Sequence, residues 1–256
     1  MLEVRTLTDG GQSAPSVLAW IEELIGRAQR TLDFAHYDLH LGPEHASVVR
    51  DAIRAASARG VAVRFLYNID HRNPIPVPPP PEPDADLIAS FDVPARAIAG
   101  VPDLMHHKYV VRDGETVWTG SMNWTDDSFT RQENVVAIVR SAPIAARFAE
   151  NFAELWKTGA VELSGRVPPN PVRVDERDVR AWFTPGYGEA LSTRIAKAIA
   201  RARRRVRICS PVITAAPVLS ILAQVVSEGE VDLAGCVDQP QVHGVIHQWS
   251  ENGNVA

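Results

Sequence analysis

The sequence predicts an α/β fold in which helices flank a mixed central sheet, and three observations support this prediction. First, residues 31–37, 46–60 and 61–70 follow strand, helix and strand patterns in turn, and this order implies parallel strands joined by a crossover helix. Second, alternating stretches flank Asp113-Gly114, which is a strong signal for an antiparallel hairpin. Third, the opening pattern returns in the last third of the chain, so we expect an internal repeat.

Other stretches complete the first repeat. Apolar residues recur on one helical face over 17–29 and again over 143–157, while 95–99 and 134–139 have the composition of strands. Seven of the eleven residues in 73–83 are proline, a composition that excludes a helix or a sheet ladder. We therefore expect a stiff, extended loop there.

The domain organisation follows from the repeat. We predict a complete domain at 1–163, a linker at 164–178, and the first part of a second domain at 179–256. The segments VRFLYNIDH and VDLAGCVDQ correspond to each other with an offset of 168 residues. In the second repeat we expect helices at 189–203 and 216–228 and strands at 205–210 and 231–239.

Composition and charge limit the possible surroundings of the protein. The net charge of −5 gives no sign of general attraction to nucleic acid, so an anionic substrate would need a local basic pocket. The first residues lack the features of a signal peptide, and no apolar run approaches the ~18 residues of a membrane span. We expect a cytoplasmic protein without a stable membrane anchor. Cys209 and Cys236 are interpreted as buried, reduced thiols, with a disulfide between them as the alternative.

One stretch, which contains the sequences MHHKYVVRD and TGSMNWT, holds six residue identities at fixed spacing. These are His106-x-Lys108, then Asp113 after four residues, then Gly120-Ser121-x-Asn123 after six more. Chance alone gives such a match on the order of once in 10⁷–10⁸ start positions. The pattern resembles the HKD motif of the phospholipase D superfamily. Over 31–156 the chain is similar to the single-motif members, the Nuc-type endonucleases and the mitochondrial cardiolipin hydrolase/Zucchini group, whereas its second half resembles the two-motif members. The resemblance implies a phospholipase D-like fold.

The residue types in this motif suit phosphoryl transfer. His106 and Lys108 are two residues apart on an expected strand, so their side chains share one face. A neutral imidazole is a competent nucleophile near pH 7, and Lys108 and Asn123 can donate to the non-bridging phosphate oxygens. The Ser121 hydroxyl and the backbone at Gly120 can add donors. The resemblance implies a phosphohistidine intermediate, a second histidine that protonates the leaving group, and no metal or cofactor.

Supporting roles are expected for residues near the motif. The resemblance implies that Glu133 orients the catalytic histidine, although a surface acid is the alternative. Asp113 is expected to act structurally at the hairpin turn, and strand alternation should point His107 away from the site. Three residues follow the carboxyl ends of strands, where open α/β sheets bind ligands, and are candidates for the rim of the site: His36, Asp70 and His71.

These observations lead to a functional hypothesis. We expect a hydrolase of the phospholipase D or endonuclease type that cleaves a phosphodiester, either a phospholipid or a nucleic acid. The counterpart of His106 in the second repeat would fall near position 274, beyond Ala256, so we expect half of an active site in this chain. The other half would come from a missing C-terminal segment or a homodimer partner. The alternative is a catalytically incomplete fragment or a non-catalytic binding or regulatory module.

Overall fold

The structure, a computed structural model, describes residues 1–69, 83–100 and 103–253. The proline-rich stretch up to residue 82, together with Asp70 and His71, lies outside these described residues. Contacts divide the chain into two units, with the boundary between Gly186 and Tyr187. The two units are described separately below.

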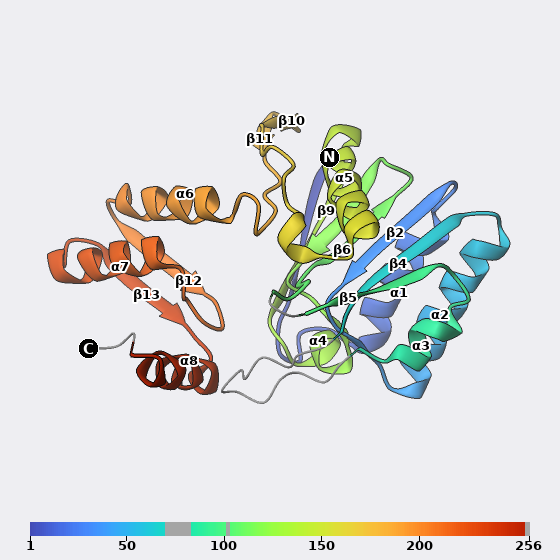
Figure 1. The fold of residues 1–256 in the computed structure, drawn as a ribbon, viewed down its shortest axis with the longest axis horizontal. Helices are drawn as coiled ribbons and strands as arrows, with labels where there is room; N and C mark the ends of the chain where they lie inside the picture. Colours follow the sequence, from blue (N-terminus) through green and yellow to red (C-terminus); the bar gives the residue numbers. More distant parts are fainter. Residues whose placement is uncertain (70–82, 101–102, 254–256) are drawn as a thin grey trace. The chain divides into compact units, whose positions relative to one another are not determined.

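The first unit is built on a seven-stranded sheet (Figure 1). In spatial order its strands are β1 (Leu2–Leu7), β9 (Asn134–Arg140), β7 (Thr116–Gly120), β6 (Lys108–Arg112), β2 (Thr31–His36), β4 (Ala62–Ile69) and β5 (Ala95–Ala99). The pairs β2–β4 and β4–β5 are parallel, while all other neighbours in this sheet are antiparallel. The predicted mixed sheet is therefore confirmed.

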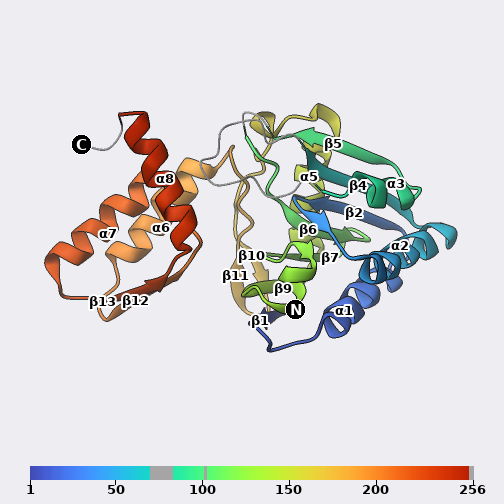
Figure 2. The same ribbon diagram turned by 90° about the horizontal axis from the view of Figure 1, so that it is seen from below.

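Helices cover both faces of this sheet (Figures 1 and 2). One face packs against α1 (Ala14–Gly26), α2 (Pro43–Ala58) and α3 (Ala85–Ser90), and the other against α5 (Ala142–Thr158). Each face has its own apolar core, because neighbouring strand residues point to opposite sides of the sheet. Short elements complete the unit: β3 (Leu39–His40), β8 (Trp124–Thr125), α4 (Asp126–Thr130) and a 3-10 turn at Val161–Leu163.

The hairpin between β6 and β7 has the turn that its sequence predicts. Asp113 and Gly114 are the central residues of a β-turn with positive φ angles, 57° and 66°, and Glu115 makes the loop three residues long. Arg112 pairs with Thr116 directly beside the turn. This turn fixes the register of the hairpin, and the register in turn fixes where the HKD motif residues lie.

The segment predicted as a linker has a structure of its own. It contains a hairpin of β10 (Val172–Val174) and β11 (Arg177–Val179), and the backbone N–H of Leu2 donates to Asp175 Oδ2 at 2.7 Å. Phe183, beyond this hairpin, is buried and packs against Phe148 of α5. The first unit therefore extends to residue 186, because buried apolar anchors tie the proline-containing segment to it.

The second unit contains α6 (Gly188–Ala200), β12 (Arg205–Cys209), α7 (Ala216–Glu228), β13 (Asp232–Cys236) and α8 (Gln239–Glu251). Its strands pair in parallel, so β12–α7–β13 repeats the strand–helix–strand order of β2–α2–β4. Cys209 and Cys236 are register partners, and both are exposed free thiols. The expectation of buried thiols is wrong, because the two-stranded sheet leaves these side chains uncovered.

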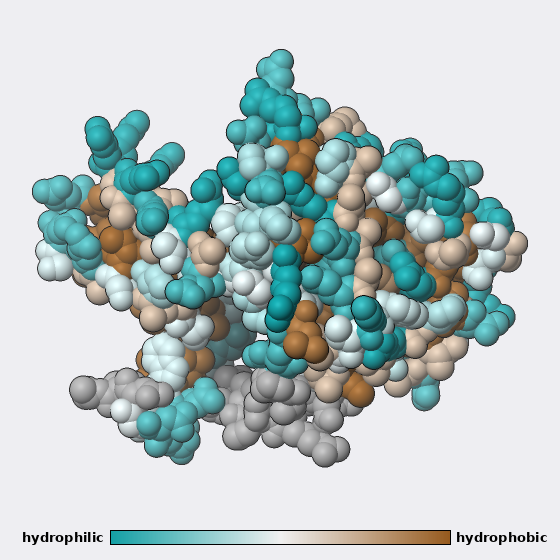
Figure 3. Space-filling view, turned by 45° about the horizontal axis from the view of Figure 1, so that its top comes forward, coloured by the Kyte–Doolittle hydropathy of each residue, from teal (hydrophilic) through white to brown (hydrophobic). Residues whose placement is uncertain are grey.

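The surface carries no extended apolar belt on the face drawn in Figure 3, where hydrophilic residues surround smaller hydrophobic areas. Large exposed apolar side chains occur singly in both units, for example Val4 and Val226. In the part of the chain that the structure describes, no helix is long and apolar enough to cross a membrane.

Candidate active site

The sheet register brings the His106-x-Lys108 and Gly-Ser-x-Asn segments of the HKD motif to one end of the sheet. His36, the last residue of β2, pairs with Lys108, the first residue of β6. Gly120, the last residue of β7, pairs with Val136 near the start of β9. The carboxyl ends of β2 and β7 and the amino ends of β6 and β9 therefore lie side by side, and the loops that leave them can form one site.

His106 and Lys108 are held together around Tyr37. The imidazole of His106 meets the Tyr37 ring edge-on with 4.4 Å between centroids, and Lys108 Nζ lies 4.6 Å from the centroid of the same ring. Lys108 Nζ also donates to the backbone carbonyl of His106 at 2.9 Å. His106 is exposed while Lys108 is buried, so the histidine is the more accessible of the two.

The surroundings shift the pKa values of both side chains downwards. Desolvation is the main reason that the pKa of His106 falls to about 3, with the Lys108 and His107 charges adding to the shift. Burial lowers the pKa of Lys108 to about 7, and the carboxylate of Asp38 opposes that shift. At pH 7 the imidazole is therefore neutral, and the lysine takes up or releases a proton readily.

The Gly-Ser turn is fixed by backbone contacts with β9. A Cβ atom at Gly120 would collide with the Val135 carbonyl oxygen, so the close approach requires glycine. The Ser121 hydroxyl donates to Asn134 Oδ1 at 2.8 Å and accepts from the Val135 N–H at 3.0 Å. In this arrangement Ser121 holds the turn in place.

Asn123 lies beside the segment that follows β2. The backbone N–H of Trp124 donates to the Asp38 carbonyl at 3.2 Å, and Trp124 pairs with Leu39 in the β3–β8 sheet. Asn123 Oδ1 is buried and has no hydrogen-bond partner within the described residues. The Asn123 amide is therefore placed next to the Tyr37–Asp38 segment that also supports Lys108.

Asp113 lies at the opposite end of β6 from Lys108. Its carboxylate accepts from the backbone N–H groups of Gln29, Arg30 and Thr31, the shortest at 2.6 Å. Partial burial alone would raise the pKa of Asp113, but these backbone donors outweigh it and hold the pKa below its usual value. Asp113 thus ties the hairpin turn to the loop before β2.

No hydrogen bond or ion pair joins Glu133 to His106. The Glu133 side chain is exposed, and it forms no hydrogen bond or ion pair with any described residue. It directly precedes Asn134, which holds the Gly-Ser turn. The structure therefore brings the neighbour of Glu133, and not Glu133 itself, into the hydrogen-bond network of the turn.

Two other histidines are packed away from the accessible surface of the site. His36 is fully buried, with its ring 4.3 Å from Trp124 and both ring nitrogens lacking a partner among the described residues, so its expected place at the rim is wrong. His107 packs with Tyr109 and Phe183 at centroid distances of 5.3 and 6.4 Å. Alternation along the chain accounts for this placement, because His107 and Lys108 point to opposite sides of the sheet.

Tyr37 is the site residue that the sequence analysis missed. It directly follows β2, and its ring touches both His106 and Lys108. The rule that ligands bind at the carboxyl ends of strands pointed to this region but selected its neighbour His36. Strand alternation could not have selected Tyr37 instead, because His36 is the register partner of Lys108 and lies on the same face of the sheet.

The fold and this group of side chains together define a phospholipase D-like domain. The family model described as "Cardiolipin synthase, PLD-like domain" matches residues 21–156, more than half of the chain, and the chain belongs to this family. Curated relatives are named mitochondrial cardiolipin hydrolases. The one from Homo sapiens is 32% identical over 148 residues, which cover 57% of this chain and 56% of the relative. The one from Chlamydomonas reinhardtii is 25% identical over 142 residues, which cover 56% and 58%.

The chain thus spans less than two thirds of the length of these two relatives. A solved structure, phosphatidylserine synthase from Haemophilus influenzae Rd KW20, resembles 91% of this chain over 61% of its own, with a TM-score of 0.60 and 12% sequence identity. At that identity the likeness concerns the fold alone.

Proposed function

We propose that this chain carries one half of a phosphodiesterase active site in which His106 is the nucleophile. The observation that carries this proposal is the placement of an accessible, neutral His106 beside Lys108, with both side chains held against Tyr37. A nucleophile that needs no deprotonation at pH 7 and a neighbouring cation are the two groups that attack on an anionic phosphodiester requires.

In the proposed reaction a ring nitrogen of His106 attacks phosphorus, and the bond from phosphorus to one ester oxygen breaks. The leaving oxygen takes a proton and departs as an alcohol, leaving a phosphohistidine. Water then attacks phosphorus, releases a phosphomonoester and restores the imidazole. Lys108 and Asn123 donate to the non-bridging oxygens, whose charge changes in both steps, and Gly120 and Ser121 shape the turn that presents Asn123.

The leaving oxygen needs an acid on the opposite side of phosphorus from His106. The packing of His36 and His107 makes both poor candidates for this acid. We infer that the second histidine comes from a second copy of this chain or from another segment with the same motif. The second unit is our candidate for part of a second phospholipase D-like domain, supported by its repeated strand–helix–strand order.

Two substrate classes fit this chemistry, phospholipids and nucleic acids. The names of the relatives favour a phospholipid such as cardiolipin, and the absence of a substrate-specific feature at the motif keeps nucleic acid as the second class. Activity on cardiolipin vesicles and on single-stranded DNA, measured side by side, would assign the class.

The test of the proposal is to trap the intermediate. Rapid quenching with base after mixing with a labelled phosphodiester should preserve a base-stable, acid-labile adduct on His106, and His106→Ala should reduce turnover of bis(p-nitrophenyl) phosphate by at least ~10³-fold. His107→Gln, one residue away, is the matched control and should keep most of the activity. Full turnover by His106→Ala would rule the mechanism out, and no turnover or adduct in any oligomeric fraction would favour a non-catalytic module.

A further inference from the structure

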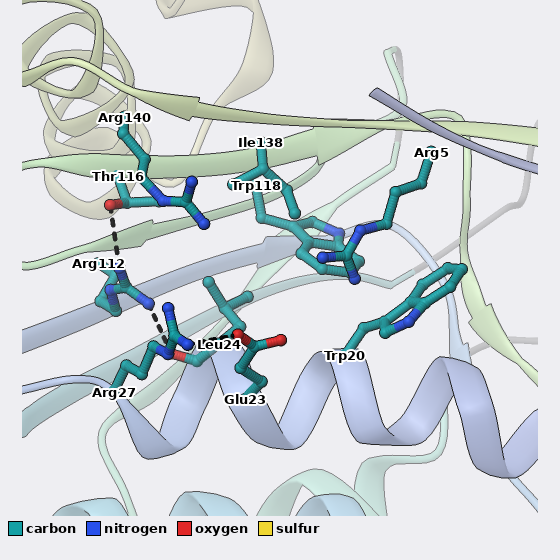
Figure 4. Close-up of a pocket in the computed structure, with 10 residues that line it drawn as sticks. All are labelled: Arg5, Trp20, Glu23, Leu24, Arg27, Arg112, Thr116, Trp118, Ile138 and Arg140. Atoms are coloured by element: carbon teal, nitrogen blue, oxygen red, sulfur yellow. Dashed lines mark hydrogen bonds and ion pairs between the residues drawn. The ribbon is translucent and has the colours of Figure 1, made fainter. Parts of the chain in front are cut away.

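A second group of charged residues lies on the first unit, away from His106. It surrounds a cleft between α1 and the face of the sheet formed by β1, β9, β7 and β6 (Figure 4). Four arginines line this cleft: Arg5, Arg27, Arg112 and Arg140. Arg112 is four residues from Lys108 along β6, or about 13 Å at ~3.3 Å per residue, so the cleft is separate from the HKD site.

Carboxylates do not balance these arginines. Glu23 is the one acid that lines the cleft, and it pairs with Arg27 at 2.8 Å. Glu3 lies nearby, where it contacts Arg5 at 2.6 Å and Arg140 at 3.6 Å. With Asp113, whose charge also acts on Arg112, three carboxylates face four guanidinium groups, which leaves an excess of one positive charge.

Within residues 1–69, 83–100 and 103–253, Arg112 donates no hydrogen bond to a carboxylate. Its guanidinium donates to the Leu24 carbonyl at 3.4 Å and to Thr116 Oγ1 at 3.1 Å, both neutral oxygens. Partial burial lowers the pKa of Arg112, and the charges of Arg27 and Arg140 lower it further, although Asp113 and Glu23 oppose them. Arg27, Arg112 and Arg140 lie on the same side of the cleft, where they can act on a common anion (Figure 4).

The opposite side of the cleft is aromatic. The guanidinium of Arg5 stacks over Trp20 at 4.7 Å, and Trp118 lies behind it (Figure 4). Arg5 Nη1 is buried and has no hydrogen-bond partner in the described parts of the chain. One donor at the cleft is therefore unused, although buried donors are normally satisfied.

A structural role explains only part of this arrangement. Arg112 contacts a carbonyl in the last turn of α1, where a cation stabilises the helix end. Arg140 lies on β9 and contacts no carbonyl of α1. Its position in the cleft adds charge without helping to hold the helix.

We infer that this cleft binds a phosphate-type oxyanion between Arg27, Arg112 and Arg140. Arginine forks match the oxygens of phosphate, and a partly desolvated site strengthens such charge-assisted bonds. Two kinds of ligand carry such an oxyanion: free inorganic phosphate and an organic phosphomonoester. A phosphomonoester would also place its organic part towards Trp20 and Trp118. This inference does not depend on the proposed reaction at His106.

Calorimetric titration of the full chain with inorganic phosphate tests this inference, at fixed pH and ionic strength. We expect Arg140→Gln to weaken binding by about tenfold or more, because one charge-assisted contact is lost. Glu23→Gln should strengthen binding several-fold by removing the competing carboxylate, an effect that misfolding could not imitate. Arg50→Gln, which removes an exposed pair with Asp51 on α2, is the matched control and should change nothing.

A second arm separates the cleft from the HKD site and one ligand source from the other. Phosphate binding should survive Lys108→Ala, because the cleft lies at the other end of β6. Tighter binding of phenyl phosphate than of phosphate would identify a phosphomonoester as the ligand, and equal binding would identify free phosphate. The inference would be overturned if Arg140→Gln and Glu23→Gln both bound phosphate as the wild type does. It would also be overturned if Lys108→Ala were the only variant that lost binding.

Discussion

Lys108 combines two properties that oppose each other. It is buried, which disfavours its charged form, and yet it must be cationic to stabilise a phosphate in the proposed reaction. Its pKa of about 7 means that the free protein loses this charge just above neutral pH. The lowered pKa of His106 keeps its imidazole neutral around pH 7, so the lysine and not the nucleophile should limit activity near neutrality.

We therefore predict that kcat/KM falls as pH rises above about 7 in the wild-type protein. Lys108→Arg should lower the activity but move this alkaline limb upwards by at least about one pH unit, because arginine keeps its proton. Bis(p-nitrophenyl) phosphate is the suitable substrate, since its leaving group needs little help from an acid. If the alkaline limb stays at the same pH in Lys108→Arg, then a group other than Lys108 causes it.

His36 affects stability through its buried ring. Desolvation, and secondly the charge of Lys108, lower its pKa to about 3, whereas in the unfolded chain it is near 6.5. Below pH 6.5 the unfolded state therefore binds a proton that the folded state does not, and stability falls as pH decreases from 6.5 towards 3. A residue of similar shape that does not titrate should remove this dependence.

His36→Phe should accordingly have little effect at pH 7 and increase the free energy of unfolding by about 2 kcal/mol relative to wild type at pH 4.5. Urea denaturation followed by tryptophan fluorescence at both pH values measures the difference. His247→Gln, an exposed histidine in α8, serves as the control. An equal effect of His36→Phe at the two pH values would mean that packing and not protonation is responsible.

At this scale the sequence indicates the motif directly, but not the residues that pack around it. His106, Lys108 and the Gly-Ser turn could be found because their spacing is local and fits one hairpin. Tyr37 could not be found in this way, since its contacts depend on β2 lying beside β6. The role expected for Glu133 rested on resemblance, and no described contact supports it.

At the scale of elements, the β6–β7 hairpin is the support on which the site depends. One end carries Lys108, and the other is fixed by Asp113 to the loop between α1 and β2. The φ angle of 57° at Asp113 is one that aspartate and asparagine tolerate better than most residues. Asp113 therefore contributes both to the turn and to its attachment.

Asp113→Ala should lower the free energy of unfolding by about 1–2 kcal/mol, because several backbone donors lose their acceptor. Asp113→Asn should lose less stability than Asp113→Ala, since asparagine keeps the turn conformation and one acceptor oxygen. Glu115→Ala, which removes only an exposed ion pair with Arg30, is the control and should have little effect. Chemical denaturation at pH 7 compares the three variants. An alanine variant as stable as wild type would contradict the anchoring role.

The elements that the sequence failed to predict share a cause. In β1, Val4 is exposed while Arg5 reaches the arginine cleft, so the usual pattern of apolar residues facing inwards is inverted. Its partner β9 lies more than a hundred residues away, and only this pairing makes it a strand. The β10–β11 hairpin likewise depends on anchors in the first unit. Strands with local partners, such as β6 and β7, were predictable.

At the scale of the whole molecule, the open question is what completes the active site. One HKD motif presents one accessible histidine, whereas the proposed reaction needs a nucleophile and an acid on opposite sides of phosphorus. General acid catalysis is typically worth ~10²–10⁴-fold, so a single copy on its own should be nearly inactive. If two copies form one site around a symmetry axis, each site contains two His106 residues.

This arrangement predicts a specific dependence on subunit composition. When wild-type and His106→Ala chains are co-expressed with different tags, activity should vary with the square of the wild-type fraction, so an equal mixture retains about one quarter of the activity. If the second half of the site comes from another polypeptide, each wild-type copy works independently and an equal mixture retains about one half. His107→Gln in place of His106→Ala should leave the mixture nearly fully active. Light scattering on each fraction gives its mass, and full activity in a strictly monomeric fraction would show that one chain holds a complete site.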